Sequence, residues 1–235
     1  MVKTVLNWSS GKDAALAFYM LRQERKYEVT TLLTTLNSDA GRIMMHGVRE
    51  EMLDLQAGRM NLPLKKIMLP ASPDDTVYSA AMQTTLDGLK EEGITCSAFG
   101  DIHLEDLRKY RENQLKQVGL EAVFPLWGMG SRELVQLIEE TGIEAVIVCV
   151  NEKYLGKEFL GRKIGPALLA DLPAGVDACG EYGEFHTYVY NAPYFDSPIA
   201  WQPGETVHKV YTHENTGTAW DKGFFFMDVL PAGQL

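Results

Sequence analysis

Residues 2–21 constrain the fold of this chain most strongly, because a strand there runs directly into a helix. The mainly apolar residues 2–8 predict a short buried strand, and residues 14–21 carry apolar side chains at helical spacing. A turn of small and charged residues, 9–13, joins the two. In such a unit, several backbone N–H groups and the positive end of the helix dipole point at one spot. The sequence therefore predicts a phosphate-binding turn near the N-terminus.

The turn supplies the side chains that we expect to hold the phosphates of a nucleotide. It is not a Walker A loop, which requires G-x-x-x-x-G-K-[ST]. S-S-G-K-D-A instead resembles the S-G-G-K-D-S loop of the ATP pyrophosphatases, with Ser10 at a glycine position and Ala14 at the last serine. This resemblance implies ATP as the cofactor; an ordinary strand-to-helix turn with a capping serine is the alternative. The residues of the turn are Ser9, Ser10, Gly11, Lys12 and Asp13.

Strands and helices alternate through residues 1–127, which we expect to form a nucleotide-binding α/β domain. Five strands separated by helices indicate a doubly wound parallel sheet of the HUP, or adenine nucleotide alpha hydrolase-like, kind. Ligands bind such sheets beyond the carboxyl ends of the strands. After residues 2–8, the spacing predicts strands at 29–36, 62–69, 95–99 and 122–124, and helices at 46–60, 73–91 and 104–118.

The fourth predicted strand ends in Gly100 and Asp101, which we expect to face the nucleotide. Asp101 is a candidate ligand for magnesium or for ribose, and its alternative role is that of a turn cap.

Residues 128–235 change character, and we expect them to form a smaller α+β substrate-binding lobe. A helix is predicted at 131–140 and a buried strand at 143–150. Glycine and proline then become frequent, and residues of period two indicate antiparallel strands. These strands are predicted at 184–190, 207–212 and 224–229.

A second cluster of chemically capable residues lies at the start of the strand at 184–190. Glu181, Glu184 and His186 fall within six residues, and Gly180 and Gly183 allow the backbone to turn sharply or to approach a ligand. Glu184 and His186 would project from one face of a strand. Such a group can bind ammonium, a metal or a proton in transit. An exposed strand start with solvated carboxylates is the alternative.

Five motifs in order along nearly the whole chain resemble the diphthine–ammonia ligase family, and the chain is most similar to its bacterial branch. They are S-x-G-K-D, H-G-V-R at 46–49, F-G-D at 99–101, V-F-P-L-W-G at 123–128 and G-E-x-G-E-F-H-T at 180–187. The resemblance implies a ligase that adenylates a substrate carboxylate and amidates it with ammonia, releasing AMP and pyrophosphate. Eukaryotic and archaeal members are implied to amidate diphthine on elongation factor 2. This chain has His186 where those ligases more often carry Glu, and H-G-V-R in place of their usual pattern.

The implied chemistry gives a role to each cluster. Lys12 would stabilise the leaving pyrophosphate, with Mg²⁺ held by Asp13 or Asp101. Glu181 and Glu184 would hold ammonium, with His186 nearby, so that a proton can be removed before attack.

Two further pairs are candidates for binding substrate. His46 and Arg49 are three residues apart and would share a helix face, where Arg49 can pair with a substrate carboxylate. A surface ion pair with a neighbouring glutamate is the alternative for Arg49. Trp127 and Gly128 follow the fifth strand, and we expect them to line the cleft between the lobes.

Composition excludes several classes of function. The net charge of −10 argues against nucleic acid as a partner, and no run of 18 apolar residues is present to cross a membrane. Three scattered cysteines argue against a disulfide framework or a zinc site, and with no recognisable signal peptide they indicate the cytoplasm.

A non-catalytic nucleotide sensor of the universal stress protein type is the main alternative function; tRNA modification is the third. The identity of the carboxylate, the source of ammonia and the oligomeric state, a homodimer included, stay open.

Overall fold

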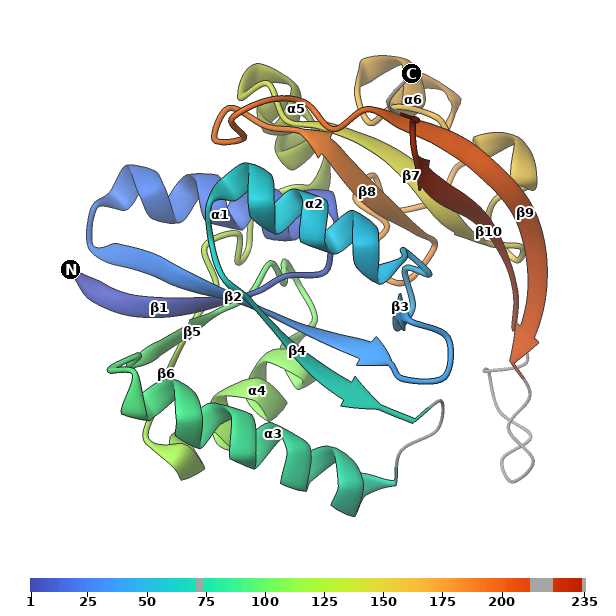
Figure 1. The fold of residues 1–235 in the computed structure, drawn as a ribbon. Helices are drawn as coiled ribbons and strands as arrows, with labels where there is room; N and C mark the ends of the chain where they lie inside the picture. The colour runs from blue at the N-terminus through green and yellow to red at the C-terminus, as the bar shows by residue number, and fades with distance from the viewer. Residues whose placement is uncertain (71–73, 212–221, 234–235) are drawn as a thin grey trace.

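The structure is a computed structural model that describes residues 1–70, 74–211 and 222–233. Two sheets, one from each half of the chain, lie on either side of a pair of helices (Figure 1). Within the described residues, no helix is both long and apolar enough to cross a membrane.

The first sheet is the predicted five-stranded parallel sheet, with one short antiparallel strand added. Strand β2 carries β1 on one edge and β4 on the other, and β5 and β6 continue beyond β1. The order of strands along the chain therefore reverses between β1 and β5, where α/β sheets bind their ligands. The strands are β1 (Val2–Asn7), β2 (Tyr27–Asn37), β3 (Arg42–Ile43), β4 (Leu64–Leu69), β5 (Cys96–Ala98) and β6 (Glu121–Val123).

Helices cover both faces of this sheet, which confirms the doubly wound arrangement. Figure 1 shows α1 and α2 on the face toward the second sheet and α3 and α4 on the opposite face. The predicted helix at 46–60 begins only at residue 50, because residues 42–49 form β3 and a tight turn in which Gly47 has a φ of 70°. The helices are α1 (Lys12–Glu24), α2 (Glu50–Met60), α3 (Asp75–Glu91) and α4 (Glu105–Val118).

The second half forms an antiparallel sheet in the order β8-β7-β10-β9. Its strands are β7 (Glu144–Asn151), β8 (Phe185–Asn191), β9 (Trp201–Tyr211) and β10 (Lys222–Pro231). Helix α5 (Ser131–Glu140) matches its prediction, whereas the 3-10 helix η1 (Lys157–Phe159) and helix α6 (Pro166–Asp171) lie in a stretch that we predicted only as rich in glycine and proline.

One apolar core joins both sheets. Phe18 of α1 and Leu53 of α2 belong to the same buried cluster as Val148 of β7 and Tyr188 of β8. The second lobe is thus packed on the helices of the first rather than tethered by a linker. The domain boundary at 127/128 stays a prediction, although the chain does pass from one sheet to the other between β6 and β7.

An ionic clamp also connects the two halves. Asp228 of β10 accepts hydrogen bonds from Arg42 of β3 at 2.8 Å and from Arg49 at 2.6 Å. Burial opposes ionisation of Asp228, but the two guanidinium groups outweigh it and lower its pKa from 3.8 to about 2. The carboxylate therefore stabilises the folded chain at neutral pH.

We expect Asp228→Asn to lower the free energy of unfolding by about 2 kcal/mol at pH 7, the equivalent of that pKa difference. Because the folded-state pKa is depressed, this contribution is present above pH 3.8 and is lost as the pH falls toward 2. Urea unfolding of both proteins between pH 7 and pH 3 measures it. As a control, Asp196→Asn removes the more exposed ion pair with Arg59 and should cost under about 1 kcal/mol. If the difference in free energy of unfolding between the native chain and Asp228→Asn does not shrink below pH 4, the ion pairs of Asp228 do not stabilise the fold as proposed.

Candidate functional site

A cavity of roughly 960 Å³ opens at the carboxyl ends of β1, β2 and β5 and faces the second sheet. Its walls come from the predicted phosphate turn, from the end of β5, from α3 and α4, and from residues 179–187 before and within β8. Of the predicted site residues, Ser9, Lys12, Asp13, His46, Gly100, Asp101, Gly180, Glu181, Gly183 and His186 line it. The cavity therefore lies at the topological switch point of the sheet, where ligands of α/β folds bind.

The turn after β1 is held in shape by its neighbours. Ser10 has a φ of 71°, so this serine adopts the left-handed conformation that glycine adopts more easily. The carbonyl of Ser10 accepts hydrogen bonds from the Val189 amide at 2.9 Å and from Gln56 Nε2 at 3.1 Å. Ser10 and Gly11 lie behind the cavity wall, and a Cβ on Gly11 would stand 2.9 Å from His46 Cε1. Ser10 and Gly11 therefore support the turn on the side away from the cavity, and their direct contact with phosphate stays a prediction.

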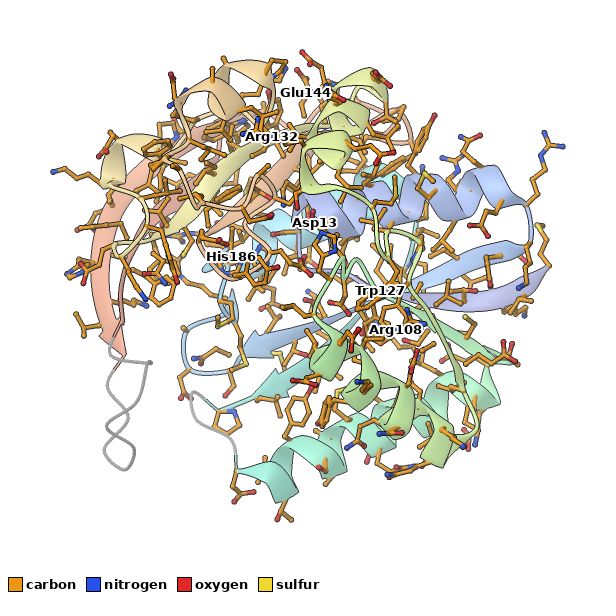
Figure 2. The ribbon with its side chains drawn as sticks, turned by 180° about the vertical axis from the view of Figure 1, so that it is seen from behind. Asp13, Arg108, Trp127, Arg132, Glu144 and His186 are labelled. Carbon is orange, nitrogen blue, oxygen red and sulfur yellow. The ribbon has the colours of Figure 1, made fainter. Side chains whose placement is uncertain are left out.

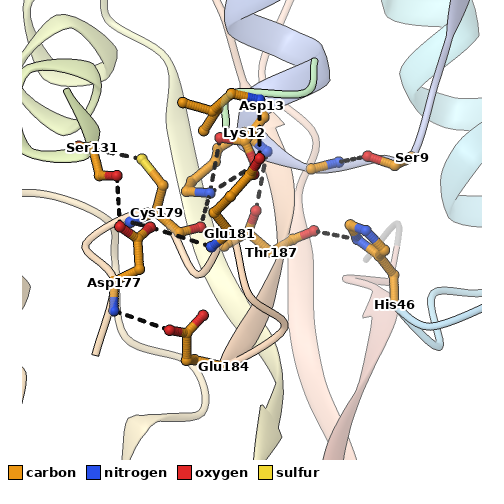
Figure 3. A network of polar contacts seen from close by, with 12 residues as sticks. Ser9, Lys12, Asp13, His46, Ser131, Asp177, Cys179, Glu181, Glu184 and Thr187 are labelled. Carbon is orange, nitrogen blue, oxygen red and sulfur yellow. Dashed lines mark hydrogen bonds and ion pairs between the residues drawn. The ribbon is translucent and has the colours of Figure 1, made fainter. Parts of the chain in front are cut away.

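Lys12 is a buried charge on the wall of the cavity. Its side chain is 2% exposed, and its ammonium contacts Asp13 Oδ2 at 2.8 Å and the Cys179 carbonyl (Figure 3). Its backbone amide donates to Thr187 Oγ1 at 3.0 Å. Burial alone would lower the pKa of Lys12, but the Asp13 carboxylate outweighs burial and raises it above 10.5. Lys12 is therefore a fixed positive charge at neutral pH.

Asp101 lies at the end of β5, next to the start of α1. Its carboxylate pairs with Arg111 of α4 at 2.8 Å. Burial raises the pKa of Asp101, although Arg111 opposes this, and the nearby Asp13 adds to the rise. Each of the two carboxylates thus has a cationic partner, and both residues line the cavity. Magnesium beside nucleotide phosphates is usually held by one or two carboxylates, and the binding of magnesium by Asp13 or Asp101 stays a prediction. Within the described ranges, no group of three or more His, Cys, Asp or Glu residues forms a complete metal cage.

Glu181 connects the second lobe to the end of β5. One oxygen of its carboxylate accepts hydrogen bonds from the amides of Ile102 at 3.0 Å and His103 at 2.9 Å. Burial raises the pKa of Glu181, the two amides oppose it, and Asp13 adds to the rise.

Glu184 is placed differently from Glu181. It is 2% exposed, and its two oxygens accept hydrogen bonds from the amides of Asp177 at 3.1 Å and Tyr182 at 3.0 Å. It does not line the cavity, so it stabilises the loop of residues 177–184, and its catalytic role stays a prediction. Gly180 has a φ of 68°, and a Cβ there would lie 2.7 Å from the Phe185 carbonyl oxygen.

His46 and His186 lie against each other on the cavity wall, with ring centroids 4.6 Å apart and planes at 33°. His46 Nδ1 is 3.2 Å from the Thr187 carbonyl oxygen. Burial, with a smaller contribution from the Lys12 charge, lowers the pKa of His46 to about 4 although the bond to the Thr187 carbonyl opposes it. Burial, followed by His46 and Lys12, lowers the pKa of His186 well below 6.5. Both imidazoles are therefore neutral at physiological pH.

Three predicted substrate contacts lie outside the cavity lining. Arg49 pairs with Asp228, as described above. Trp127 lies under the guanidinium of Arg108, 4.6 Å from the ring centre (Figure 2), and the Gly128 amide donates to Ile102 O at 2.9 Å. Their predicted contacts with substrate stay predictions.

Two residues important to the site were not predicted. Asn7 ends β1 and donates from Nδ2 to Ser97 Oγ and to the Ala98 carbonyl, both at 2.9 Å, which ties β1 to β5 at the cavity floor. Gln56 is fully buried, accepts from Trp8 Nε1 at 2.8 Å and bridges Ser10 to β8. Its position four residues from both Met52 and Met60 is the signal that could have revealed it, since it places an amide on the apolar face of α2.

Comparisons with known proteins match both halves of the chain. The diphthamide synthase N-terminal domain family matches residues 2–122, and the diphthamide synthase C-terminal domain family matches residues 131–222. A diphthine–ammonia ligase of Rattus norvegicus is 27% identical over 85% of this chain and 82% of its own length. The Bos taurus protein of that name is 29% identical over 70% of this chain and 67% of its own length.

Two solved structures resemble part of the chain at lower similarity. One is described as a subunit of a tRNA methyltransferase from Methanocaldococcus jannaschii, with 18% identity, a TM-score of 0.39, and coverage of 67% of this chain and 82% of its own. The other is the U34-tRNA thiolase NcsA from Methanococcus maripaludis, with 16% identity, a TM-score of 0.36, and coverage of 59% and 55%. These scores are too low to carry an argument about function.

Proposed function

Because the chain belongs to the diphthamide synthase family, we propose that it is an ATP-dependent ligase that adenylates a carboxylate and then amidates it with ammonia. The relatives named diphthine–ammonia ligase support this reaction class. The single observation that carries the proposal within this chain is the position of Lys12, a buried cation on the wall of a large cavity at the switch point of the sheet. The identity of the carboxylate is left open.

The phosphates of ATP would lie along Ser9, Lys12 and Asp13, where the cavity meets the start of α1. Lys12 is already charged, desolvated and oriented by Asp13, so it can stabilise the developing charge on pyrophosphate with little rearrangement. Asp13 and Asp101 would hold Mg²⁺, which neutralises phosphate charge when bound.

The second lobe would supply the wall that excludes water. Glu181 spans from this lobe to the amides after β5, and the Cys179 carbonyl reaches Lys12. An acyl adenylate formed at this point would be enclosed by both lobes, which protects it from hydrolysis until ammonia attacks.

The reaction products test the proposal directly. Incubation with ATP labelled in the α phosphate, ammonium and a panel of carboxylic acids is expected to release AMP and pyrophosphate, and to do so only when an acceptor carboxylate is present. Thin-layer chromatography separates the labelled nucleotides. ADP as the sole product would contradict the proposed mechanism.

A nucleotide sensor without turnover is the alternative that one observation favours. The Lys12 amide is already bonded to Thr187, and the Lys12 ammonium is paired, so the turn is filled in part by its own contacts. ATP binding without AMP release for any carboxylate would support that alternative. The three cysteines are unpaired and buried, which supports the cytoplasm as the compartment that we propose.

A further inference from the structure

We propose that His46 and His186 form the ammonium-binding site of this ligase, with His186 Nε2 as the acceptor that receives an N–H of the ligand. The inference rests on the proposed function and adds the place and the chemistry by which the nitrogen donor is bound. It gives Glu184 a structural role only.

The geometry leaves one ring nitrogen of the pair without a partner. His186 Nε2 is buried and has no hydrogen-bond partner among the described residues, although its side chain lines the cavity. A buried polar atom of this kind is rarely left unsatisfied. The ring of His46 lies 4.6 Å away, and its Nδ1 donates to the Thr187 carbonyl. That bond leaves His46 Nε2 as the lone-pair nitrogen. In the tautomer that we assign to His186, with its proton on Nδ1, the pair offers two acceptors.

The charge state of the pair suits a cationic ligand. Burial keeps both imidazoles neutral, and the ammonium of Lys12 adds to this effect. A neutral imidazole accepts a hydrogen bond from ammonium, whereas a protonated one would repel it. Asp13 and Glu181 also line this cavity and attract a small cation into it, while Lys12 limits how close to the turn that cation can approach.

Two other assignments fit less well. Glu184 has both carboxylate oxygens bonded to backbone amides and lies outside the cavity lining, so it offers little to a ligand there. A transition metal would find two imidazoles, but in the part of the chain that the structure describes no third His, Cys, Asp or Glu completes a site. Ammonium needs only acceptors at hydrogen-bond distance.

Bound ammonium, hydrogen-bonded to His186 Nε2, loses one proton to water and becomes ammonia, whose lone pair attacks the acyl carbon of the adenylate. The C–N bond forms, the bond between that carbon and the phosphate oxygen of AMP breaks, and the electron pair leaves with AMP. The nitrogen then loses a second proton to water, so the products are the amide, AMP and two protons. His186 holds the nitrogen in place and stays neutral throughout.

Ammonium binding can be measured without a carboxylate substrate. We would titrate the intact ¹⁵N-labelled protein with ammonium chloride and follow the imidazole nitrogens of His46 and His186 by NMR. Potassium chloride at the same concentrations is the matched control, because potassium resembles ammonium in size and charge but has no N–H to donate. We expect saturable shifts with ammonium and none with potassium.

Two variants complete the test. In His186→Phe, the His46 signal should respond to ammonium with at least tenfold weaker affinity. In His208→Phe, which removes an exposed histidine of β9 that pairs with Glu152 after β7, the response should be unchanged. Equal shifts with potassium in the native protein, or undiminished ammonium affinity in His186→Phe, would overturn the site. Because this readout needs no turnover, failure to release AMP would count against the proposed ligase reaction and not against the binding site.

Discussion

Replacing Lys12 by methionine is expected to reduce the rate of AMP release at least 100-fold. Methionine keeps much of the length and apolar stem of lysine but removes the buried charge that faces the cavity. Loss of one preorganised donor at a site of developing charge typically costs 10²- to 10³-fold in rate. The measurement is the initial rate of labelled AMP formation at saturating ATP.

Folding must be separated from chemistry in this variant, because Lys12→Met leaves the Asp13 carboxylate without its partner. The double variant Lys12→Met with Asp13→Asn removes that unpaired charge and should recover stability, measured by thermal unfolding, without recovering activity. Lys163→Met is the matched control, since Lys163 lies on the surface of the second lobe and pairs with Glu144. An active Lys12→Met protein, within a few-fold of the native rate, would remove Lys12 from the mechanism.

The parallel sheet was predictable because strand-like apolar runs alternate with amphipathic helical stretches through the first half of the chain. The order of the strands was not predictable from periodicity, since it depends on which edges pair. Residues 42–49 show a second limit. We predicted a helix from residue 46, yet residues 46–49 belong to the turn between β3 and α2. Arg42 and Arg49, on either side of this turn, both pair with Asp228 some 180 residues away, a contact that local spacing cannot reveal.

The site was predictable where its residues are close in sequence and not where they meet through the fold. The turn at 9–13 and the loop at 177–184 each appear as a motif, and the structure brings both to one cavity. The motif could not separate Glu181, which faces the cavity, from Glu184, which is bonded to the backbone of its own loop. The contact between the rings of His46 and His186 was equally hidden, because it joins the turn before α2 to β8.

Gly100→Ala, which adds a single methyl group, is expected to reduce the rate of AMP release by about 100-fold. A Cβ at this position would lie 2.8 Å from the carbonyl carbon of Asp13 and 2.9 Å from the amide nitrogen of Ala14. Both are backbone atoms of the first turn of α1, so neither can rotate away as a side chain would. The end of β5 must therefore move away from the phosphate turn, and displacements near 1 Å cost on the order of 10²-fold in activity.

The same substitution should lower the free energy of unfolding by about 1–3 kcal/mol, the usual cost of overpacking. Gly58→Ala is the matched control, because Gly58 lies on the exposed face of α2 with no atom within 4 Å of an added Cβ. That variant should keep full activity and gain about 0.5–1 kcal/mol, as alanine favours a helix more than glycine does. If Gly100→Ala binds and turns over ATP as the native chain does, the junction of β5 with α1 does not position the nucleotide, and the cavity at the switch point would need a different ligand.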